Sequence, residues 1–534
     1  MESTQNRMNV IICDGLNPEG QEILRNTQGL IVDDRTSISR EDLEQIIGGY
    51  QAMIVRSRTK VDEKLMALGS NLKVIGRAGT GVDNIDVPAA TRKGILVMNT
   101  PGANALAAAE HAIALMLSLA RHIPQATASM REGRWDKKRF VGTEVSGRTL
   151  GVIGLGNVGK LAAERAIGLR MHVLGFDPYL APDTAKKMGV EIVDLDTIFA
   201  ESDFITLHSP LTDDTRNLIN RDAFSKMKKG VRIINCARGG IVNEEDLYEA
   251  IQSGVVAGAA LDVFAKEPPA ADHPLLKLPN IIVTPHLGAS SEQSQIKVAV
   301  TIAQQIGDFL KDGIIKNAVN LPVSALKDLD KISPYLELIQ SMGRFLSQVH
   351  LGTVERVDME YCGVLADLDV SLLTSGALKG LLDPVVSEAV NLINAPLEAQ
   401  KRGIKVFENK STETEGYSGL VRLTVRSQDQ EFSLAGTVFV DSGPRIVRIN
   451  EFFTETRASG NILVIRNNDR PGVIGDIGHT LGKHEINIAK MHLARNKPGD
   501  QAMALLKVDA LLSEDILDEL RSLPNIVEVK QVQL

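Results

Sequence analysis

Three residues suited to acid–base chemistry follow three consecutive β-rich segments. Arg238 lies in "NCARGG", Glu267 in "ALDVFAKEPP" and His286 in "TPHLGAS". A neutral histidine can remove a hydroxyl proton near neutral pH, and a carboxylate on its other ring nitrogen fixes the tautomer and stabilises the imidazolium. A guanidinium grips a carboxylate through two parallel hydrogen bonds. We therefore expect oxidation of a hydroxy acid, with His286 as acid/base, Glu267 as its orienting partner and Arg238 as the carboxylate clamp.

Taken singly, each residue has an ordinary alternative. His286 could be a loop histidine bonded to backbone, Glu267 a solvated turn residue, and Arg238 a cap on a carbonyl group. Their position after consecutive strands, downstream of a nucleotide-binding loop, favours the catalytic interpretation.

That loop is "GLGNVG", which follows the strand-like "GVIG" and opens a helical segment. Gly154 permits a tight turn, Gly156 lets the backbone approach a pyrophosphate, and Gly159 permits close helix packing. The pyrophosphate would lie at the helix N-terminus, where N–H groups and the helix dipole favour an anion. Asp177 ends the next strand, where an acid accepts ribose hydroxyls and repels a 2′-phosphate. The pattern predicts NAD as cofactor; the alternative is a tight turn without a ligand.

The surrounding elements alternate between β-rich and helical segments. This rhythm begins at residue 9 and starts again at residue 148, and it predicts two doubly wound, Rossmann-like α/β domains. Ligands bind beyond the carboxyl ends of strands in such sheets. We interpret the helices at 105–122 and 290–312 as crossings between the domains. The substrate-binding domain is then discontinuous, with residues 1–104 and 290–321, and the NAD-binding domain covers 105–289.

The rhythm stops after residue 321. Residues 322–457 read as an α+β intervening domain. Residues 458–534 read strand, helix, strand, strand, helix, strand, which is the pattern of a ferredoxin-like domain.

Composition limits the classes of partner. Of 534 residues, 43% are hydrophobic and 24% charged, and the net charge is −8, which suits a globular protein and argues against a nucleic-acid partner. Cys13, Cys236 and Cys362 are too few and too scattered for a disulfide framework or a zinc site, so no metal is predicted. The apolar helix near 105–120 is too short and polar for a membrane span. We expect a cytoplasmic protein.

Several segments resemble the D-2-hydroxy acid dehydrogenase family: "GLGNVG", "NCARGGIVNEEDL", "ALDVFAKEPP", "TPHLGASSEQSQ" and "RAGTGVDNIDVPAATRKGILVMNTPGAN". From residue 9 to 534 the chain more narrowly resembles the long-form D-3-phosphoglycerate dehydrogenases, which end in an ACT regulatory domain. The resemblance implies NAD-dependent oxidation of 3-phospho-D-glycerate to 3-phosphohydroxypyruvate, the first step of L-serine biosynthesis. It also implies a homo-oligomer, either a dimer through the nucleotide domain or a tetramer through the tails.

The resemblance assigns site residues. Arg238, Glu267 and His286 match the catalytic set, and Cys236 is expected to pack beside the nicotinamide rather than act as a nucleophile. The expected cofactor contacts are Thr80, Gly154, Gly156, Asn157, Val158, Gly159, Asp177, Ser209, Cys236, Ala237, Arg238, Asp262 and Gly288.

A phosphorylated substrate needs positive charge away from the redox centre. Arg56, Arg58 and Arg77 are candidates for the phosphate, as is the basic run at 131–139, which could reach in from a neighbouring subunit. The backbone N–H groups of Ala78, Gly79 and Thr80 are candidates for the carboxylate. The alternative is that these arginines pair with surface acids.

In the last domain, "NNDRPGVIGDIG" resembles an ACT ligand loop. Asn467, Asp469 and Asn487 are candidates to hold L-serine as an effector; the alternative is a domain that only assembles subunits. In the intervening domain, Lys410, Arg445 and Arg448 are candidate anion contacts.

Two rival functions are a glyoxylate or hydroxypyruvate reductase and a nucleotide-sensing transcriptional co-repressor.

Overall fold

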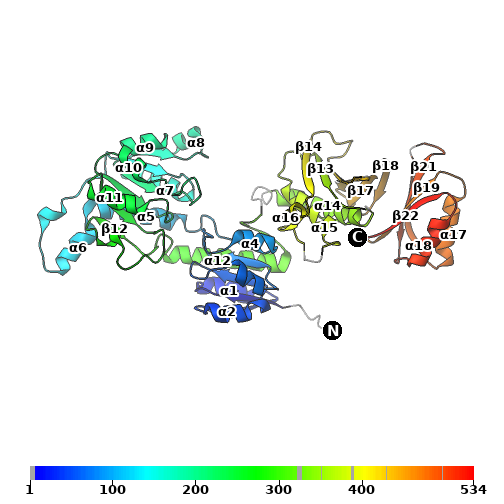
Figure 1. The fold of residues 1–534 in the computed structure, drawn as a ribbon, viewed down its shortest axis with the longest axis horizontal. Coiled ribbons are helices and arrows are strands. Elements are labelled where there is room, and N and C mark those ends of the chain that lie inside the picture. Colours follow the sequence, from blue (N-terminus) through cyan, green and yellow to red (C-terminus); the bar gives the residue numbers. More distant parts are fainter. Residues whose placement is uncertain (1–6, 322–327, 350–351, 387–389, 429, 496) are drawn as a thin grey trace.

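The computed structural model describes residues 7–321, 328–349, 352–386, 390–428, 430–495 and 497–534. These residues form four β-sheets with their helices in an elongated molecule (Figure 1). The nucleotide-binding unit lies at the left of that view, the N-terminal unit at the lower centre, and the intervening and C-terminal units at the right. The predicted boundary at 321/322 adjoins residues outside the described ranges.

The N-terminal sheet is fully parallel, with strand order β2-β1-β3-β4-β5. Its buried strands are short apolar runs, as expected where helices cover both faces. The elements are β1 (Met8–Ile12), α1 (Pro18–Asn26), β2 (Leu30–Asp34), α2 (Arg40–Ile46), β3 (Ala52–Val55), α3 (Glu63–Leu68), β4 (Val74–Arg77), α4 (Val87–Arg92) and β5 (Leu96–Met98).

Two long helices link this unit to the next. Helix α12 (Glu292–Asp312) returns to the N-terminal sheet, where Ile302 and Ile306 share a buried core with Ile54. It packs so closely on α1 that a Cβ on Gly20 would lie 2.6 Å from the carbonyl oxygen of Ala299. Helix α5 (Ala105–Arg121) instead buries its apolar face in the nucleotide-binding core. The chain therefore crosses twice between the units.

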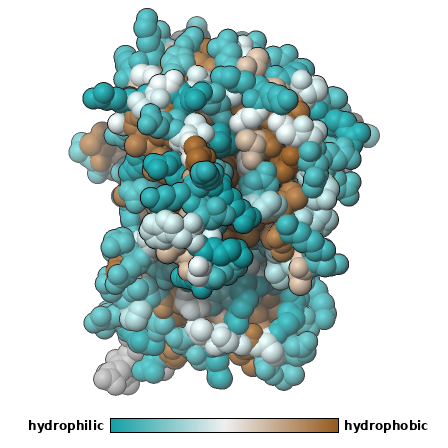
Figure 2. Space-filling model, turned by 90° about the vertical axis from the view of Figure 1, so that its left-hand side faces the viewer, coloured by the Kyte–Doolittle hydropathy of each residue, from teal (hydrophilic) through white to brown (hydrophobic). Residues whose placement is uncertain are grey.

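Among the described residues, no single helix is long and apolar enough to cross a membrane. Helix α5 reaches the required length and hydropathy only together with α6 (Ile123–Arg131), and the two are bent by 62° at His122. The end view of the molecule shows a mostly hydrophilic surface with separate hydrophobic residues (Figure 2).

The nucleotide-binding sheet has seven parallel strands in the order β12-β11-β10-β9-β6-β7-β8. The chain reverses direction across the sheet between β6 and β9, which creates the switch point where such sheets bind ligands. The sequence predicts six of these strands; the seventh, β8, is an edge strand of two residues, too short to show periodicity. The strands are β6 (Thr149–Ile153), β7 (His172–Phe176), β8 (Glu191–Ile192), β9 (Phe204–Leu207), β10 (Val231–Asn235), β11 (Val256–Leu261) and β12 (Ile281–Val283), and the intervening helices are α7 (Asn157–Gly168), α8 (Pro182–Lys187), α9 (Leu195–Glu201), α10 (Arg221–Lys226) and α11 (Glu244–Gln252).

The intervening unit is a six-stranded mixed sheet covered on one face by α14 and α15. These helices touch backbone to backbone, since a Cβ on Gly380 would lie 2.1 Å from the carbonyl oxygen of Gln340. The elements are α14 (Leu329–Val349), β13 (Arg356–Gly363), α15 (Ser371–Leu382), α16 (Ala395–Lys401), β14 (Lys405–Ser411), β15 (Gly419–Arg426), β16 (Glu431–Phe439), β17 (Gly443–Ile449) and β18 (Phe452–Thr456).

The C-terminal unit has the predicted strand and helix order, with a sheet ordered β20-β21-β19-β22. Alternate residues of β19 face opposite cores: Leu463 and Ile465 face α17 and α18, whereas Ile462 and Val464 belong to the core that includes Phe345 of α14. The elements are β19 (Asn461–Asn468), α17 (Val473–Lys483), β20 (Ile488–Arg495), β21 (Gln501–Val508), α18 (Glu514–Ser522) and β22 (Ile526–Gln533).

Candidate active site

Arg238, Glu267 and His286 line one cavity of about 520 Å³ between the N-terminal and nucleotide-binding units. They follow β10, β11 and β12, which are neighbours in the sheet, so the three loops converge at its carboxyl edge. Arg56 and Arg77, from the carboxyl edge of the N-terminal sheet, line the same cavity. The structure therefore brings together the five charged residues expected to act on the substrate.

His286 and Glu267 form a hydrogen-bonded pair. The distance from His286 Nδ1 to Glu267 Oε2 is 2.8 Å, and Glu267 Oε1 accepts the backbone N–H of Phe264 at 3.1 Å. The hydrogen bond and charge of Glu267 raise the pKa of His286 above its ordinary value, although burial opposes this. Burial raises the pKa of Glu267, but the hydrogen bond and charge of His286 and the N–H of Phe264 together outweigh burial, so the net direction is down. The geometry leaves Nε2 of His286 as the free ring nitrogen.

The loop that carries His286 is fixed by Asp262. This carboxylate is 1% exposed and accepts hydrogen bonds from the backbone N–H groups of Leu287 at 2.7 Å and Gly288 at 2.8 Å. It also accepts the hydroxyl of Thr284 at 2.5 Å and lies 3.3 Å from Nε2 of His111 on α5. Burial raises the pKa of Asp262, but these hydrogen bonds together lower it by more. The net pKa is below the ordinary value, so the group is held as a carboxylate. Asp262 and Gly288, which the sequence predicts at the cofactor, thus hold the loop that carries His286.

Arg238 extends from a loop shaped by Asn235. The Asn235 side chain accepts the N–H of Ala237 at 3.0 Å and donates to the carbonyl of Arg238 at 3.0 Å. The guanidinium of Arg238 reaches across to the N-terminal unit, where Nε donates to Asp83 Oδ2 at 3.0 Å. It lies directly over Gly81, since a Cβ there would be 2.1 Å from Nη2. The guanidinium of Arg238 is therefore held between the N-terminal and nucleotide-binding units.

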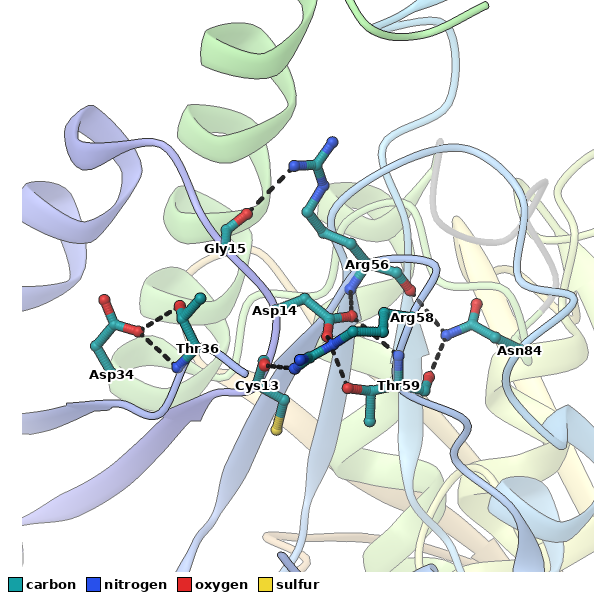
Figure 3. A network of polar contacts seen from close by, with 9 residues as sticks. All are labelled: Cys13, Asp14, Gly15, Asp34, Thr36, Arg56, Arg58, Thr59 and Asn84. Atoms are coloured by element: carbon teal, nitrogen blue, oxygen red, sulfur yellow. Dashed lines mark hydrogen bonds and ion pairs between the residues drawn. The ribbon is translucent and has the colours of Figure 1, made fainter. Parts of the chain in front are cut away.

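Arg56 is positioned by a buried carboxylate (Figure 3). Asp14, which is 4% exposed, accepts the backbone N–H of Arg56 at 2.7 Å, and its other oxygen accepts the hydroxyl of Thr59 at 2.7 Å. Arg58 also pairs with Asp14, at 3.0 Å, and donates to the carbonyl of Cys13. Arg58 is thus engaged with the loop, and it is absent from the described residues that line the cavity. Arg56 keeps its guanidinium on the cavity side, 3.3 Å from the carbonyl of Gly15.

Arg77 is a half-buried cation next to two others. Burial, together with the nearby charges of Arg238 and Arg56, lowers its pKa to about 10. Its Nη1 donates to the carbonyl of Ala78 at 2.9 Å, and its buried Nε has no partner among the described residues. A cluster of cations with a spare donor is the chemistry expected around an anion.

Two of the three backbone N–H groups expected to hold the substrate carboxylate, those of Ala78 and Gly79, are engaged within the protein. Ala78 donates its N–H to the carbonyl of Val55 at 2.8 Å, and Gly79 donates to the carbonyl of Arg77 at 2.8 Å. The parallel pairing of β3 with β4 continues one residue beyond the strands, which a one-dimensional pattern does not show. Both residues line the cavity, but their N–H groups are turned to the protein.

The glycine loop has the geometry that a pyrophosphate requires. Gly154 has φ of +92°, and a Cβ on Gly159 would lie 1.9 Å from the carbonyl oxygen of Gly154. A Cβ on Gly156 would meet nothing within 4 Å, so the backbone is open there. Helix α7 begins at Asn157 without a side-chain cap, which leaves its first N–H groups for an anion, with Val158 half-buried beside them.

Other predicted cofactor positions surround this loop. The Asp177 carboxylate accepts N–H groups of Leu155 at 2.8 Å and Tyr179 at 2.9 Å. Ser209 has a buried hydroxyl without a partner among the described residues. The hydroxyl of Thr80 is hydrogen-bonded to the Asn104 side chain at 2.7 Å. Burial raises the pKa of Cys236, in keeping with a packing role rather than a nucleophilic one.

The residues predicted to hold the effector lie in the C-terminal unit, on or next to β19 and β20. Asn467 is 3% exposed, and its side-chain oxygen has no partner in the described part of the chain. Asp469 accepts a hydrogen bond from Arg495 at 2.9 Å and from the N–H of Gly499 at 3.0 Å, whereas Asn487 donates to Asp509 at 2.8 Å.

In the intervening unit, the three candidate anion contacts are engaged or buried. Lys410 donates to the carbonyl of Leu368, Arg445 is buried, and Arg448 pairs with Glu415 at 3.5 Å.

Sequence reasoning missed several residues of the site. Lys60 lines the cavity after β3, and its place in "RSRTK" beside Arg56 is a signal that could have found it. Asp83 and His111 reach their partners across more than 150 positions of the chain, and no local pattern marks them. His208 is half-buried, its Nδ1 has no hydrogen-bond partner among the described residues, and burial lowers its pKa to about 4. Within the described ranges, no group of three or more His, Cys, Asp or Glu side chains could hold a metal ion.

Comparisons with known proteins agree with this geometry. Residues 113–288 match the D-isomer specific 2-hydroxyacid dehydrogenase NAD binding domain, 331–450 the D-3-phosphoglycerate dehydrogenase intervening domain, and 461–525 the ACT domain. The D-3-phosphoglycerate dehydrogenase of Archaeoglobus fulgidus is 43% identical over 99% of this chain and 100% of its own length. The chain belongs to the D-3-phosphoglycerate dehydrogenase family. The Bacillus subtilis member is 40% identical over 98% of this chain and 99% of its own.

Solved structures place the first two units in the wider family. The D-lactate dehydrogenase of Aquifex aeolicus, complexed with NAD and lactic acid, is 29% identical, and the match covers 59% of this chain and all of that one, with a TM-score of 0.52. A Thermus thermophilus protein, TT0316, matches 58% of this chain at 32% identity, with a TM-score of 0.55. The predicted fold class, family and NAD cofactor are thus confirmed.

Proposed function

We propose that this chain oxidises 3-phospho-D-glycerate to 3-phosphohydroxypyruvate with NAD, the first step of L-serine biosynthesis from 3-phosphoglycerate. One observation carries this assignment beyond a generic hydroxy-acid dehydrogenase. The cavity that holds His286 and Arg238 also holds Arg56, Lys60 and Arg77. A substrate with a carboxylate at one end and a phosphate at the other matches two separate cationic groups.

The chain's residues have distinct roles in this reaction. Arg238 binds the substrate carboxylate and fixes the orientation of the C2 hydroxyl group. His286 Nε2 takes the hydroxyl proton, and Glu267 stabilises the resulting imidazolium through its 2.8 Å bond to Nδ1. NAD, held by the 154–159 loop and Asp177, supplies the hydride acceptor when bound. Arg56, Lys60 and Arg77 hold the phosphate and exclude substrates that lack it.

The decisive experiment compares substrates in a rate assay. The wild-type chain should reduce NAD with 3-phosphoglycerate and do so far more slowly with D-glycerate or D-lactate. Replacing Arg56 by Gln should raise KM for 3-phosphoglycerate at least about tenfold, the cost of one lost charge-assisted hydrogen bond or more, and leave KM for NAD unchanged. Lys64→Gln is a matched control, since Lys64 pairs with Glu44 outside the cavity. Equal effects on both KM values would refute the phosphate assignment.

The same assay separates the rival functions. A glyoxylate or hydroxypyruvate reductase would turn over unphosphorylated oxo acids with NADH as fast as the phosphorylated one. A nucleotide-sensing co-repressor would bind NAD without measurable turnover of any of these acids. Either outcome would replace the proposed function.

We also propose L-serine as the effector of the ACT domain, with Asn467, Asp469 and Asn487 as its contacts. The support is the unpartnered oxygen of Asn467 beside the loop that carries Asp469. L-serine at millimolar concentration should then lower the rate, and Asn467→Ala should remove the inhibition while D-serine serves as control. A rate unchanged by L-serine would leave the domain an assembly element.

For the assembly we propose a homodimer or homotetramer. The arm at residues 123–141 exposes four large apolar side chains, namely Ile123, Met130, Trp135 and Val141, which a contact with another subunit would cover. Trp135→Glu should lower the molecular mass measured by light scattering. We place the reaction in the cytoplasm, a reducing compartment that suits the three free cysteines.

A further inference from the structure

A second large cavity, of about 930 Å³, lies between the N-terminal and intervening units. It borders the edge of the N-terminal sheet opposite to the active site, because its lining residues Gln51 and Lys73 immediately precede β3 and β4. The other wall comes from Gln340 on α14, Lys379 on α15 and the loop before α16. Two units of the chain thus contribute to one cavity remote from the catalytic residues.

The charged residues that line this interdomain cavity are all cations. Arg7, Lys73, Lys93 and Lys379 all line it, and none of its described lining residues is Asp or Glu. Among the described residues, neither Lys73 nor Lys93 has an acidic partner within ion-pair distance. Lys379 donates to the neutral side chain of Gln340 at 3.3 Å. Four like charges around one hollow repel one another until an anion neutralises them.

The walls of the cavity are set by a specific contact. Asn391 of the intervening unit donates to the carbonyl of Gly94 at 2.7 Å. Gly94 has φ of +67°, and a Cβ there would lie 2.3 Å from the Asn391 side-chain nitrogen, so only glycine allows this approach. Phe309 and Ile315 give the cavity an apolar wall beside its charged one. A preformed hollow with convergent polar groups and an apolar wall is the usual form of a small-molecule site.

We propose that this interdomain cavity binds a small organic phosphate carrying two or more negative charges. The cations Lys73, Lys93 and Lys379 would neutralise the phosphate, and Phe309 and Ile315 would cover its carbon skeleton. The site is separate from the active cavity, because Lys73 and Arg77 lie at opposite ends of β4, about 13 Å apart at the rise of a strand. Since its cations come from both units, a bound anion holds the intervening unit to the N-terminal one.

The test uses inorganic pyrophosphate as the probe and isothermal titration calorimetry on the full chain. The wild type, Lys73→Gln/Lys93→Gln, Lys379→Gln and the control Lys186→Gln/Lys187→Gln are compared at saturating NAD. The control removes the same charge from two exposed lysines of α8. Pyrophosphate that enters the active cavity contributes equally to all four proteins, so the difference between them reports the interdomain cavity.

The double variant and Lys379→Gln should each lose one class of sites or bind there at least about tenfold more weakly, as expected for a lost charge-assisted contact. The control should bind as the wild type does, and pyrophosphate should raise the Tm of the wild type but not of the double variant. Equal binding by the wild type and Lys73→Gln/Lys93→Gln would overturn the site. Loss in the double variant but not in Lys379→Gln would overturn its spanning of both units.

Discussion

Replacing Glu267 by Gln tests the assignment of His286 as the proton acceptor. The change keeps the shape of the side chain and removes the charge that faces Nδ1 at 2.8 Å. A charge-assisted hydrogen bond contributes roughly 1.5–3 kcal/mol. His286 is 47% exposed and Glu267 38%, so solvent screening places this pair near the lower end. If the imidazolium forms in the transition state, losing about 1.5–2 kcal/mol of its stabilisation lowers kcat about 10- to 30-fold.

The pH profile gives a second, independent readout. Glu267 raises the pKa of His286, and oxidation of an alcohol needs the neutral imidazole. Removing the charge lowers that pKa, so the acid limb of kcat/KM should move to lower pH. In the reducing direction the protonated ring is needed, so its alkaline limb should also move to lower pH. A change in folding alone would move neither limb.

The assays are steady-state NADH formation from 3-phosphoglycerate and NADH consumption with 3-phosphohydroxypyruvate, each between pH 5 and 10 in a constant-ionic-strength buffer. Glu519→Gln is the matched control, because Glu519 faces His484 at 2.7 Å in the C-terminal unit. It should leave kcat and both limbs unchanged. If Glu267→Gln kept the wild-type kcat and pH limbs, His286 would not depend on Glu267 and the proposed acid–base pair would be wrong.

Three further predictions concern the units that support the site. Burial raises the pKa of Asp14, but its hydrogen bonds lower it by more, so the net pKa is decreased. The Asp14 carboxylate therefore stabilises the folded state above the unfolded-state pKa, and this stabilisation is lost as the pH falls through the folded-state pKa. Asp14→Asn should therefore cost about 2 kcal/mol of unfolding free energy at pH 7, and this cost should shrink as the pH falls through the folded-state pKa of Asp14, as measured by denaturant titration at each pH. Asp177→Ala should weaken NAD binding and reduce the preference for NAD over NADP, measured by fluorescence titration; an unchanged preference would remove its assigned role. Gly159→Ala, with its Cβ 1.9 Å from the Gly154 carbonyl, should abolish NAD binding, whereas Gly168→Ala at the exposed end of α7 should not.

The sequence predicts the fold and the site residues that follow strands. Buried parallel strands are continuous apolar runs, and the residues that end them must meet at one edge of the sheet. The convergence of Arg238, Glu267 and His286 on one cavity could therefore be predicted without coordinates. The glycine loop could be assigned because its strand, turn and helix are contiguous in the chain.

What the sequence does not predict are contacts that exist only in three dimensions. His111 reaches Asp262 from a helix 151 positions earlier in the chain, and Asp83 reaches Arg238 from the other domain. The sequence offers the N–H of Ala78 as a substrate contact, but in the structure this N–H donates to the carbonyl of Val55 as the pairing of β3 and β4 continues. Arg58 looks equivalent to Arg56, but the buried Asp14 holds it on the loop. In each case the partner is fixed by packing between elements.

The ion pair between Arg238 and Asp83 connects these predictions to substrate binding. Asp83 is 68% exposed, and such pairs contribute about 0–1 kcal/mol. A substrate carboxylate can therefore replace or share Asp83 at small cost, because it offers Arg238 two parallel hydrogen bonds in a more enclosed position. Until then, Asp83 keeps the guanidinium over Gly81 and close to the cavity. Because Arg238 and Asp83 belong to different domains and both line the cavity, their contact bridges the two units at the site where the proposed substrate would bind.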